Sequence, residues 1–416
     1  MNRNRKMNRR PRRRSDAAEV GRLLPFHDCL EERIQAVARV ADAWLSKKSI
    51  WMRRAEREIP AHNPCSSEMV RACLTRAFAG HHVPALRAWV QRDLPDKPAF
   101  PSEQSDVLIV PPSTVFAAVW QAATAAWLAG ARVILNPSRR EPAFSRLLAE
   151  SITALAGHVL PVRRADFLGK EGGSPQLKRP ALRGIVAYGN DQTLEHFRTL
   201  ARSNVGLIGF GARISLAYLD KRALTIRKIR ALTRAAAEDA TLYDTQGCLS
   251  PRCFYIEEGG AVSPRRFAEE LAGAMRDLDR KIPRRKTDED RWMEEAFWQR
   301  WVFRQTQGRA CFFGQRDRYV ILERGPRLEP SSLKRVVFVK PVKSMAEMLA
   351  HSADWHGRVS TIAVTQSANL RRLQQALGMK TGIRFCAPWE MHQPPAGWRN
   401  CGLNLPGTVN QWISRT

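Results

Sequence analysis

A cysteine beside a glycine is the residue with the clearest potential for covalent chemistry. Cys248 lies in the segment Gln246-Gly247-Cys248-Leu249-Ser250-Pro251. A cysteine that follows glycine can occupy a tight turn with an exposed sulfur and a free backbone N–H, and a nucleophile that forms a tetrahedral adduct needs both. Free cysteines are more often inert core residues, so the assignment depends on the motifs around this one.

Polar residues also follow several apolar runs. Ser113 comes soon after VLIV at 107–110, Asn136-Pro137-Ser138-Arg139-Arg140 follows RVIL at 132–135, and Gly189-Asn190 follows GIVAY at 184–188. Gly189-Asn190 opens a helical pattern, so its backbone amides are placed to meet a phosphate group. The segment lacks the G-x-G-x-x-G pattern and is a weak signal by itself.

Strands and helices alternate in the middle of the chain. The apolar pattern predicts strands at 107–110, 132–135, 184–189 and 204–210, and helices at 113–130, 143–156 and 191–202. Ser113 and Thr114 are expected to cap the first of these helices and Gly130 to end it. Nearly all-apolar strands between helices indicate an α/β fold with a parallel sheet covered on both faces.

The second half of the chain continues the alternation. A turn at Cys248 leads into a strand, and the pattern predicts helices at 221–239, 263–279 and 287–306 and strands at 335–342, 359–365 and 382–387. Residues 21–100 have a helical pattern rich in Trp and Arg, and no motif in them points to chemistry.

The composition is that of a folded protein with a large excess of positive charge. The 416 residues include 68 Lys and Arg against 40 Asp and Glu, which gives a formal charge of +28. Eight of these cations lie in the first fourteen residues, in a stretch that is typical of a solvated tail. Basic charge attracts phosphate non-specifically. No zinc finger, RNA-binding signature or basic recognition helix is present, so no specific nucleic-acid partner is expected.

The sequence favours a reducing, cytoplasmic location. No apolar core follows the basic start, which argues against a signal peptide. The uncharged stretch 107–131 is long enough to span a bilayer, but Pro111 and Pro112 interrupt it, and we interpret it as a buried strand and helix. The eight cysteines form no CxxC pair and have no zinc-ligand spacing, so no metal site is expected.

Taken together, the segments resemble the aldehyde dehydrogenase superfamily, and more closely the bacterial long-chain acyl-CoA reductases that include the reductase subunit of the bioluminescence fatty-acid reductase complex. The resemblance covers about residues 100–390. QGCLSP at 246–251 is its specific block, and the weaker blocks are IVPPSTVF at 109–116, ILNPSRREP at 134–142, VAYGNDQT at 186–193 and GFGARIS at 209–215. The resemblance implies a parallel Rossmann-type cofactor domain and a second α/β catalytic domain.

The patterns along the chain and the resemblance together predict a division of the chain into regions. These are a basic disordered tail at 1–20, a helical region at 21–100, a nicotinamide cofactor domain at 101–212, a catalytic domain at 213–390 and a segment at 391–416 that returns to the cofactor domain or makes an oligomer contact. The last region resembles a Trp-x-His-Asp-Gly ending of the family, with Asn400 and Cys401 in place of the His and Asp. No role is carried over to those two residues.

Cys248 and Ser113 are the catalytic residues that the resemblance implies. Cys248 matches the nucleophile that accepts the acyl group. Ser113 stands where the superfamily has an Asn that helps to hold the oxyanion, and its separation of 23 residues from Asn136 agrees with the usual interval to the cofactor-binding Lys-Pro-Ser. A serine hydroxyl can donate in place of the amide, although its reach is shorter.

The cofactor that the resemblance implies is NADPH. In NAD-preferring members a Glu in Lys-Pro-Ser-Glu accepts a hydrogen bond from the adenosine ribose. Here that acid is absent and Arg139 with Arg140 favours a 2′-phosphate. The residues expected to bind the cofactor are Asn136, Ser138, Arg139, Arg140, Gly189, Asn190, Gly209 and Gly211.

Gly209 also bears on the direction of the reaction. It stands where the superfamily has the Glu that activates water for deacylation. Without a base, water attacks a thioester slowly, whereas hydride transfer needs no base. The acyl-enzyme is therefore expected to survive until it is reduced to the aldehyde. Glu238 and Asp239, shortly before Cys248, are the alternative bases, although helix-surface carboxylates are more usual.

We therefore expect NADPH-dependent reduction of a long-chain acyl-CoA or acyl-protein thioester, with an acyl-activating synthetase as a partner and a homo-oligomeric state. Two alternatives remain. An oxidising aldehyde dehydrogenase would produce acid rather than aldehyde, and the glycine at 209 argues against it. A binding partner that keeps the fold without activity, with the basic tail docked on an acidic protein, would not bind NADPH.

Overall fold

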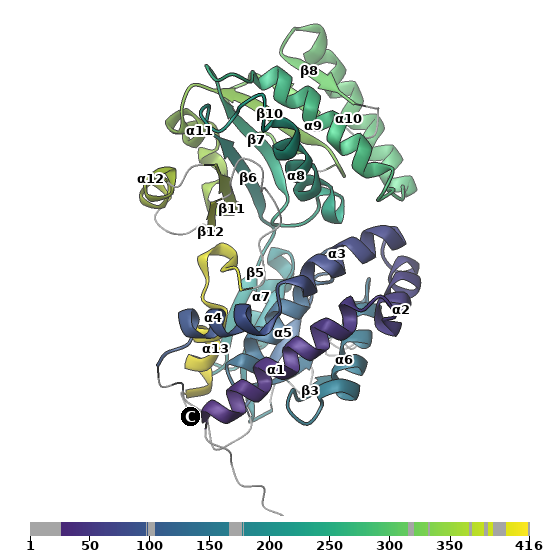
Figure 1. The fold of residues 1–416 in the computed structure, drawn as a ribbon, viewed down its shortest axis with the longest axis vertical. Helices are drawn as coiled ribbons and strands as arrows, with labels where there is room; N and C mark the ends of the chain where they lie inside the picture. Colours follow the sequence, from purple (N-terminus) through teal and green to yellow (C-terminus); the bar gives the residue numbers. More distant parts are fainter. Residues whose placement is uncertain are drawn as a thin grey trace, which may run out of the picture.

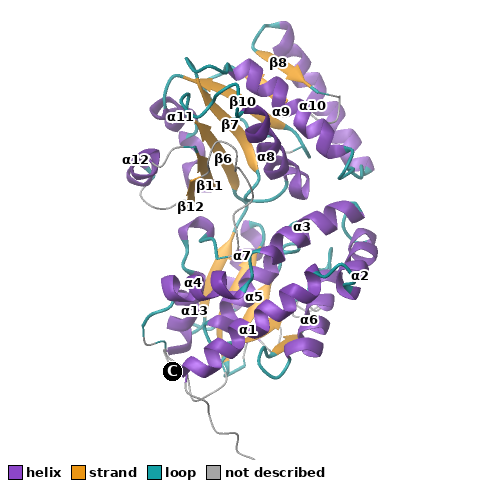
Figure 2. Ribbon diagram, viewed as in Figure 1, coloured by secondary structure: helices purple, strands orange, loops and turns teal. Residues whose placement is uncertain are grey.

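The chain forms two lobes, each built on its own β-sheet (Figures 1 and 2). The computed structural model describes residues 26–96, 98, 105–165, 177, 179–314, 320–331, 333–365, 368–377, 382–385 and 397–414. The basic tail predicted at 1–20 lies outside the described residues. The described strands of the first sheet lie between 106 and 210, and those of the second between 214 and 385.

The first sheet is wholly parallel, with the strand order β3-β2-β1-β4-β5. Its strands are β1 (Asp106–Val110), β2 (Arg132–Leu135), β3 (Val162–Arg164), β4 (Leu182–Tyr188) and β5 (Gly206–Phe210). β1 is buried along its whole length, as its aliphatic run predicts for a strand covered on both faces. The chain moves outward from β1 to β3 and returns to β4, which creates a switch point at the carboxyl ends of β1 and β4.

The second sheet has the order β12-β11-β6-β7-β10-β9-β8 and is parallel except for the edge strand β8, which is antiparallel to β9. Its strands are β6 (Ile214–Leu219), β7 (Pro251–Glu257), β8 (Ala310–Phe313), β9 (Val320–Glu323), β10 (Val337–Val342), β11 (Val359–Val364) and β12 (Gly382–Phe385). The chain passes from β5 into β6 through Gly211, Ala212 and Arg213 alone, so the ends of the two sheets lie close together.

Helices cover both faces of the first sheet. Those of this lobe are α1 (Phe26–Leu45), α2 (Ile50–Glu58), α3 (Ser67–Ala79), α4 (Val83–Asp93), α5 (Ala118–Leu128), α6 (Ala143–Ala156), α7 (Asp191–Leu200) and α13 (Leu405–Ser414). Val107 and Ile109 of β1 pack in the core with α5, α6 and α13, whereas Leu108 packs with Phe197 of α7 on the opposite face. Alternate residues of one buried strand thus serve two separate cores.

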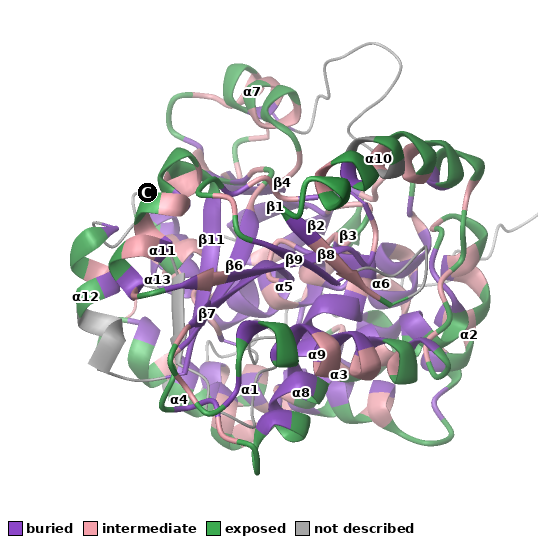
Figure 3. Ribbon diagram, turned by 90° about the horizontal axis from the view of Figure 1, so that it is seen from above, coloured by how far each residue is buried: buried purple, intermediate pink, exposed green. Residues whose placement is uncertain are grey.

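The second sheet is covered in the same way. Its helices are α8 (Ile229–Thr241), α9 (Pro264–Asp279), α10 (Asp288–Thr306), α11 (Met345–His351) and α12 (Ala368–Ala376). Side chains of α8 and α9 pack on one face, and Trp301, Met348 and Leu373 of the other three helices pack on the other. Figure 3 shows the buried strands in purple between helices whose outer faces are green.

The helical N-terminal region is part of the first lobe. Trp44 of α1 stacks on Phe78 of α3 with ring centroids 5.0 Å apart, and Phe78 contacts Trp120 of α5 at 4.7 Å. The Trp44 indole N–H donates to Ser151 of α6 at 3.0 Å. Burial of such large aromatic side chains is strongly stabilising, so α1 and α3 are firmly attached to the helices that cover the sheet.

The first predicted helix begins later than the sequence pattern indicates. Ser113 and Thr114 do not cap it, because α5 starts at Ala118 and its N-cap, Ala117, makes no side-chain cap. Residues 111–117 instead form a loop that lines a cavity. Gly130 follows the end of α5 with φ +102°, a left-handed conformation that glycine adopts without strain, as predicted.

The other predicted elements of the first sheet are confirmed, but its edge strand β3 and several elements of the second sheet were missed. The uncharged stretch at 107–131 is β1 and α5, as predicted, and no helix within the described ranges is long and apolar enough to cross a bilayer. The helix predicted at 221–239 begins at Ile229. The short strands β3, β8 and β9 were missed, as was β6, whose ISLAYL run directly follows the GFGAR block.

The last helix returns to the first sheet and lies on a glycine surface. Gly184 of β4 and Gly206 of β5 are direct neighbours across the two strands. A Cβ atom on either glycine would overlap the indole of Trp412 in α13. The two glycines therefore allow α13 to approach the sheet more closely than any other residue would permit.

Replacing Gly184 by Ala should destabilise the first lobe. The added methyl group must displace the Trp412 ring, and such overpacking costs about 1–3 kcal/mol in the free energy of unfolding, measured by urea denaturation. Gly273→Ala in α9 is the matched control, because nothing lies within 4 Å of its added Cβ. Trp412→Leu combined with Gly184→Ala should recover part of the loss, and equal stability of Gly184→Ala and the wild type would contradict this packing.

Candidate active site

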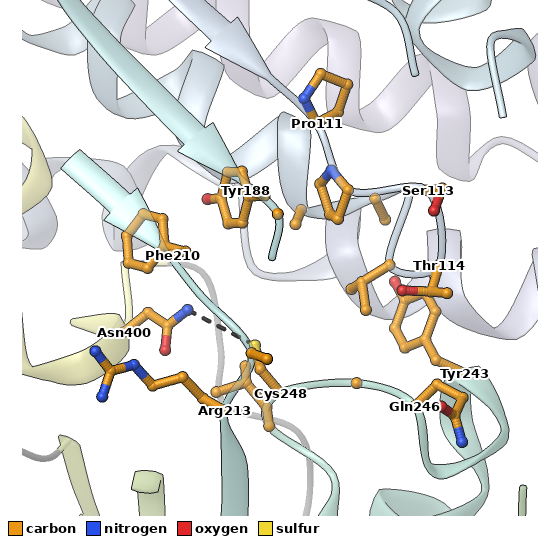
Figure 4. Close-up of a pocket in the computed structure, with 18 of the residues that line it drawn as sticks. Pro111, Ser113, Thr114, Tyr188, Phe210, Arg213, Tyr243, Gln246, Cys248 and Asn400 are labelled. Atoms are coloured by element: carbon orange, nitrogen blue, oxygen red, sulfur yellow. Dashed lines mark hydrogen bonds between the residues drawn. The ribbon is translucent and has the colours of Figure 1, made fainter. Parts of the chain in front are cut away.

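A cavity of about 900 Å³ lies between the two lobes, at the carboxyl ends of the strands of the first sheet. Its lining includes residues that directly follow strands β1, β2, β4 and β5 of the first sheet. The turn before β7 also lines it, and Figure 4 shows part of this lining. Of the predicted site residues, the cavity is lined by Cys248, Ser113, Asn136, Ser138, Arg139, Arg140, Gly189, Asn190 and Gly211. Gly209 alone among them is outside it.

The position of Gly209 follows from strand alternation. Phe210 lines the cavity, so its neighbour Gly209 faces the other side of β5. A Cβ on Gly209 would come within 3.1 Å of Leu194 in α7. A carboxylate placed at 209 would therefore not face Cys248, and the position that does face the cavity holds a phenyl ring.

The turn before Cys248 has an unusual backbone. Tyr243, Asp244 and Thr245 all have positive φ values, of 56°, 52° and 64°. Non-glycine residues rarely adopt this left-handed region, and three in succession need support from their surroundings. The Thr245 hydroxyl donates to the carbonyl of Ala240 at 2.7 Å, and the amide of Gln246 donates to the carbonyl of Tyr243 at 2.8 Å.

A buried arginine holds this turn in place. Arg335, which is 1% exposed, donates through Nε to Asp244 at 2.6 Å and through Nη1 to Asp279 of α9. Its backbone amide donates to the hydroxyl of Thr245 at 3.0 Å. Arg335 therefore fixes the left-handed turn by both its side chain and its backbone, and the turn in turn places Gly247 and Cys248 at the cavity.

Cys248 is half-buried, and its sulfur faces the cavity (Figure 4). Its carbonyl accepts a hydrogen bond from the hydroxyl of Ser215 in β6 at 2.6 Å, which anchors the residue to the second sheet. Burial raises the pKa of the Cys248 thiol to about 11, and the neighbouring Cys401 adds to this effect. The side chain of Asn400, the backbone N–H of Cys248 and the charge of Arg213 act in the opposite direction.

The reactivity of Cys248 should rise steeply with pH. The thiolate is the nucleophile, and with a pKa of about 11 its fraction grows about tenfold for each pH unit from neutrality to about pH 10. The rate of Cys248 alkylation by iodoacetamide, measured by peptide mass spectrometry on the unliganded protein, should follow this slope. A plateau near pH 8 would contradict the effect of burial.

Asn400 is a site residue that the sequence did not reveal. Its amide Nδ2 donates to the sulfur of Cys248 at 3.9 Å, across 152 positions of the chain (Figure 4). The hydroxyl of Ser360 in β11 donates to the amide oxygen at 2.7 Å, which leaves the N–H groups to face the sulfur. Only the family's Trp-x-His-Asp-Gly ending marked this position, and its different residues here gave no basis for a role.

Ser113 lies elsewhere in the cavity. Figure 4 shows its side chain pointing away from Cys248, whereas the Asn400 side chain points towards the sulfur. The carbonyl of Ser113 accepts a hydrogen bond from Asn63 at 2.8 Å, which fixes the loop after β1. The structure therefore brings an amide, and not the Ser113 hydroxyl, to the nucleophile.

No carboxylate lines the cavity among the residues that the structure describes. Of the two alternative bases, Glu238 makes an ion pair with Arg76 of α3, and Asp239 is fully buried in α8. The charged residues of the lining are all arginines, namely Arg76, Arg139, Arg140, Arg213, Arg252 and Arg358. The cavity thus favours anionic ligands and, within the described residues, offers no carboxylate to activate water; the imidazole of His81 also lines it, and burial lowers the pKa of that ring to about 3.

The end of the cavity beside α7 has the features of a phosphate site. The side chain of Asn190 caps α7 by accepting from the amide of Thr193 at 2.9 Å. A Cβ on Gly189 would come within 2.7 Å of the Thr193 side chain, so glycine allows this turn to pack closely on the start of α7. Arg139 and Arg140 are exposed on the same cavity, and Tyr188 stacks on Phe210 with ring centroids 4.7 Å apart.

These features define an aldehyde dehydrogenase fold, and solved structures share it. The chain is similar to a putative aldehyde dehydrogenase from Burkholderia cenocepacia (TM-score 0.60, 13% identity, covering 86% of this chain and 78% of that one). A succinic semialdehyde dehydrogenase from Streptococcus pyogenes in complex with NADP+ gives a TM-score of 0.61 at 13% identity, covering 86% and 82%. A proline utilization A variant from Bradyrhizobium japonicum gives a TM-score of 0.63 at 17% identity. The match covers 92% of this chain but only 42% of that longer one.

The family is shown by sequence. The family model described as acyl-CoA reductase (LuxC) matches residues 27–405, so the chain belongs to this family of oxidoreductases that act on acyl groups. A search of curated proteins gives no match.

Proposed function

We propose that the protein reduces an acyl thioester to an aldehyde with NADPH, through a covalent acyl intermediate on Cys248. The observation that carries this proposal is a cavity that holds a nucleophilic cysteine, six arginines and, among the described residues, no carboxylate. A hydrolytic or oxidising aldehyde dehydrogenase must activate water after acylation, and the described lining offers no carboxylate for that step. An acyl-enzyme in such a cavity has no described carboxylate beside it to direct water at the acyl carbon.

The residues of the chain support the acylation step. The Cys248 thiolate forms a C–S bond to the thioester carbonyl carbon, and the carbonyl electron pair moves to the oxygen. Collapse of this adduct breaks the original C–S bond, and the carrier thiol leaves with the proton that Cys248 released. When the aldehyde later departs, the electron pair of the bond to Cys248 returns to the sulfur.

The residues at the α7 end of the cavity fit a nicotinamide dinucleotide phosphate. The capped N-terminus of α7, with Gly189 beside it in the cavity lining, suits a pyrophosphate, and the neighbouring cations Arg139 and Arg140 suit a 2′-phosphate. When bound, the reduced nicotinamide supplies a hydride to the acyl carbon. The stacked rings of Tyr188 and Phe210 line the same cavity as Cys248 and offer an apolar surface (Figure 4).

The remaining parts of the cavity fit an acyl thioester of an anionic carrier. Arg252 is buried, its guanidinium donates to the carbonyl of Ser331 at 3.2 Å, and burial lowers its pKa to about 10. A phosphate of coenzyme A, or of a phosphopantetheine on a protein, would balance this charge. Ala77, Trp120 and Leu242 line an apolar part that suits an alkyl chain.

The direct test of this function is an assay of NADPH oxidation with acyl-CoA substrates of increasing length. We expect turnover with aldehyde as the product and an optimum at long chains. Production of free acid would indicate an oxidising or hydrolytic enzyme instead. Absence of both NADPH binding and turnover would favour a protein that has kept the fold without activity.

The cofactor preference should depend on Arg139 and Arg140. Hydrogen bonds to a charged group contribute about 1.5–3 kcal/mol, so the Arg139→Ala/Arg140→Ala variant should bind NADPH roughly ten- to a hundredfold more weakly, with NADH affinity unchanged. Nicotinamide fluorescence measures both. Arg163→Ala/Arg164→Ala on β3 removes the same charge outside the cavity and is the matched control. An equal loss of affinity in the two variants would show a general charge effect only.

A further inference from the structure

We propose that the side-chain amide of Asn400 is a catalytic hydrogen-bond donor, which stabilises first the Cys248 thiolate and then the oxyanion that forms on the acyl carbon. The role of the amide towards the oxyanion rests on the proposed function. Its role towards the Cys248 thiolate concerns the thiol itself and is independent of the substrate.

The orientation of the amide is fixed by its neighbours. The Ser360 hydroxyl donates to Asn400 Oδ1 at 2.7 Å, and the thiol of Cys401 approaches the same oxygen at 3.6 Å. Both contacts occupy the acceptor end of the amide, so the donor end faces the sulfur, 3.9 Å away. An acyl oxygen lies one bond beyond the carbon that is attached to this sulfur, and it therefore enters the range of the same N–H group.

Asn400 is carried by a segment that several elements hold in place. Residues 397–404 lead into α13, and Figure 1 shows this yellow stretch between the two lobes. Arg92 of α4 donates to the carbonyl of Gly397 at 2.6 Å, and Gln121 of α5 donates to that of Trp398 at 2.9 Å. Arg399 pairs with the buried Asp93, at 3.0 Å through Nε. Such anchoring holds a donor rigidly, as electrostatic stabilisation requires.

The position of the Asn400 amide also explains how the site can have a serine at 113, where the superfamily has the Asn that helps to hold the oxyanion. The Ser113 hydroxyl points away from the sulfur, so it is not placed to join the backbone N–H of Cys248 as a donor to a developing oxyanion. Asn400 supplies the second donor from the opposite end of the chain. The helical N-terminal region thereby gains a functional role, since Arg92 and Asp93 of α4 hold the segment that carries the amide.

The test compares Asn400→Ala and Asn400→Asp with the wild type and with Gln411→Ala, an exposed substitution on α13. The first readout is the pH dependence of Cys248 alkylation in the unliganded protein. Loss of one hydrogen bond to a charged sulfur should move this profile upward by about one pH unit in Asn400→Ala, and further in Asn400→Asp, where a carboxylate replaces the donor. Gln411→Ala should match the wild type.

The second readout is steady-state reduction of an acyl-CoA. Removal of one oxyanion donor typically lowers the rate by ~10²–10³, so kcat should fall by this factor in Asn400→Ala while NADPH affinity and the unfolding midpoint stay unchanged. Ser360→Ala, which frees the amide, should lose less. An unshifted alkylation profile with wild-type kcat would overturn the proposal, and so would a fall in kcat accompanied by loss of NADPH binding and stability. A wild type that alkylates as described but reduces no acyl-CoA would refute the proposed function and leave the alkylation result to decide the role of the amide.

Discussion

Replacing Cys248 by Ala should abolish acyl-dependent NADPH oxidation. Without the sulfur no covalent intermediate forms, so the Asn400 amide and the backbone N–H at 248 have no tetrahedral oxyanion to stabilise. The expected loss is on the order of 10⁶-fold, as for removal of the nucleophile from a serine protease. NADPH affinity should be unchanged, since the residues proposed to bind the cofactor lie after β2 and β4.

Cys311 provides the matched control for this experiment. It is a half-buried free cysteine on β8, outside the lining of the cavity. Cys311→Ala should keep wild-type turnover, which separates the loss of one particular thiol from a general sensitivity to cysteine substitution. Turnover by Cys248→Ala within tenfold of the wild type would refute a covalent intermediate at this residue.

Replacing Arg335 by Met should both destabilise the protein and disable the nucleophile. The substitution removes the guanidinium that donates to the buried carboxylates of Asp244 and Asp279, and breaking a buried pair in this way costs about 3–5 kcal/mol in the free energy of unfolding. The left-handed turn at 243–245 also loses the side chain that holds it. Urea denaturation should show the loss of stability. Alkylation of Cys248 under native conditions should no longer follow a single exponential, because the turn that carries the residue is no longer held in one conformation.

Arg324→Met is the control for this prediction. Arg324 is exposed, and its pair with Glu258 spans 4.0 Å, so its removal should change stability by less than about 0.5 kcal/mol. Arg335→Lys should recover part of the stability because it keeps a cation between the carboxylates. A turn that kept wild-type alkylation kinetics in a destabilised Arg335→Met variant would show that Arg335 supports the fold and not the site.

Local patterns were sufficient to predict most of the first sheet. The aliphatic runs at 107–110 and 132–135 are buried on both faces, and burial of that kind leaves a continuous apolar signal in the sequence. Cys248 was identified for a similar reason, because QGCLSP is a local motif. β6 was missed because its apolar run follows a glycine block without a break that marks a new strand.

The contacts that complete the site depend on the whole fold. Asn400 reaches Cys248 from 152 positions away, and Arg335 reaches Asp244 from 91 positions away. No periodicity or spacing records such a contact. The orientation of Gly209 away from the cavity was also hidden, because a one-residue difference in strand register decides which face a side chain occupies.

The central claim is that Cys248 holds an acyl group that water does not remove, and intact-protein mass spectrometry tests it most directly. Incubation with a long-chain acyl-CoA in the absence of NADPH should add one acyl group, absent from Cys248→Ala, that persists for many turnover times. Addition of NADPH should then remove the group and release one equivalent of aldehyde. An adduct that never forms, or that disappears as free acid without NADPH, would contradict the account.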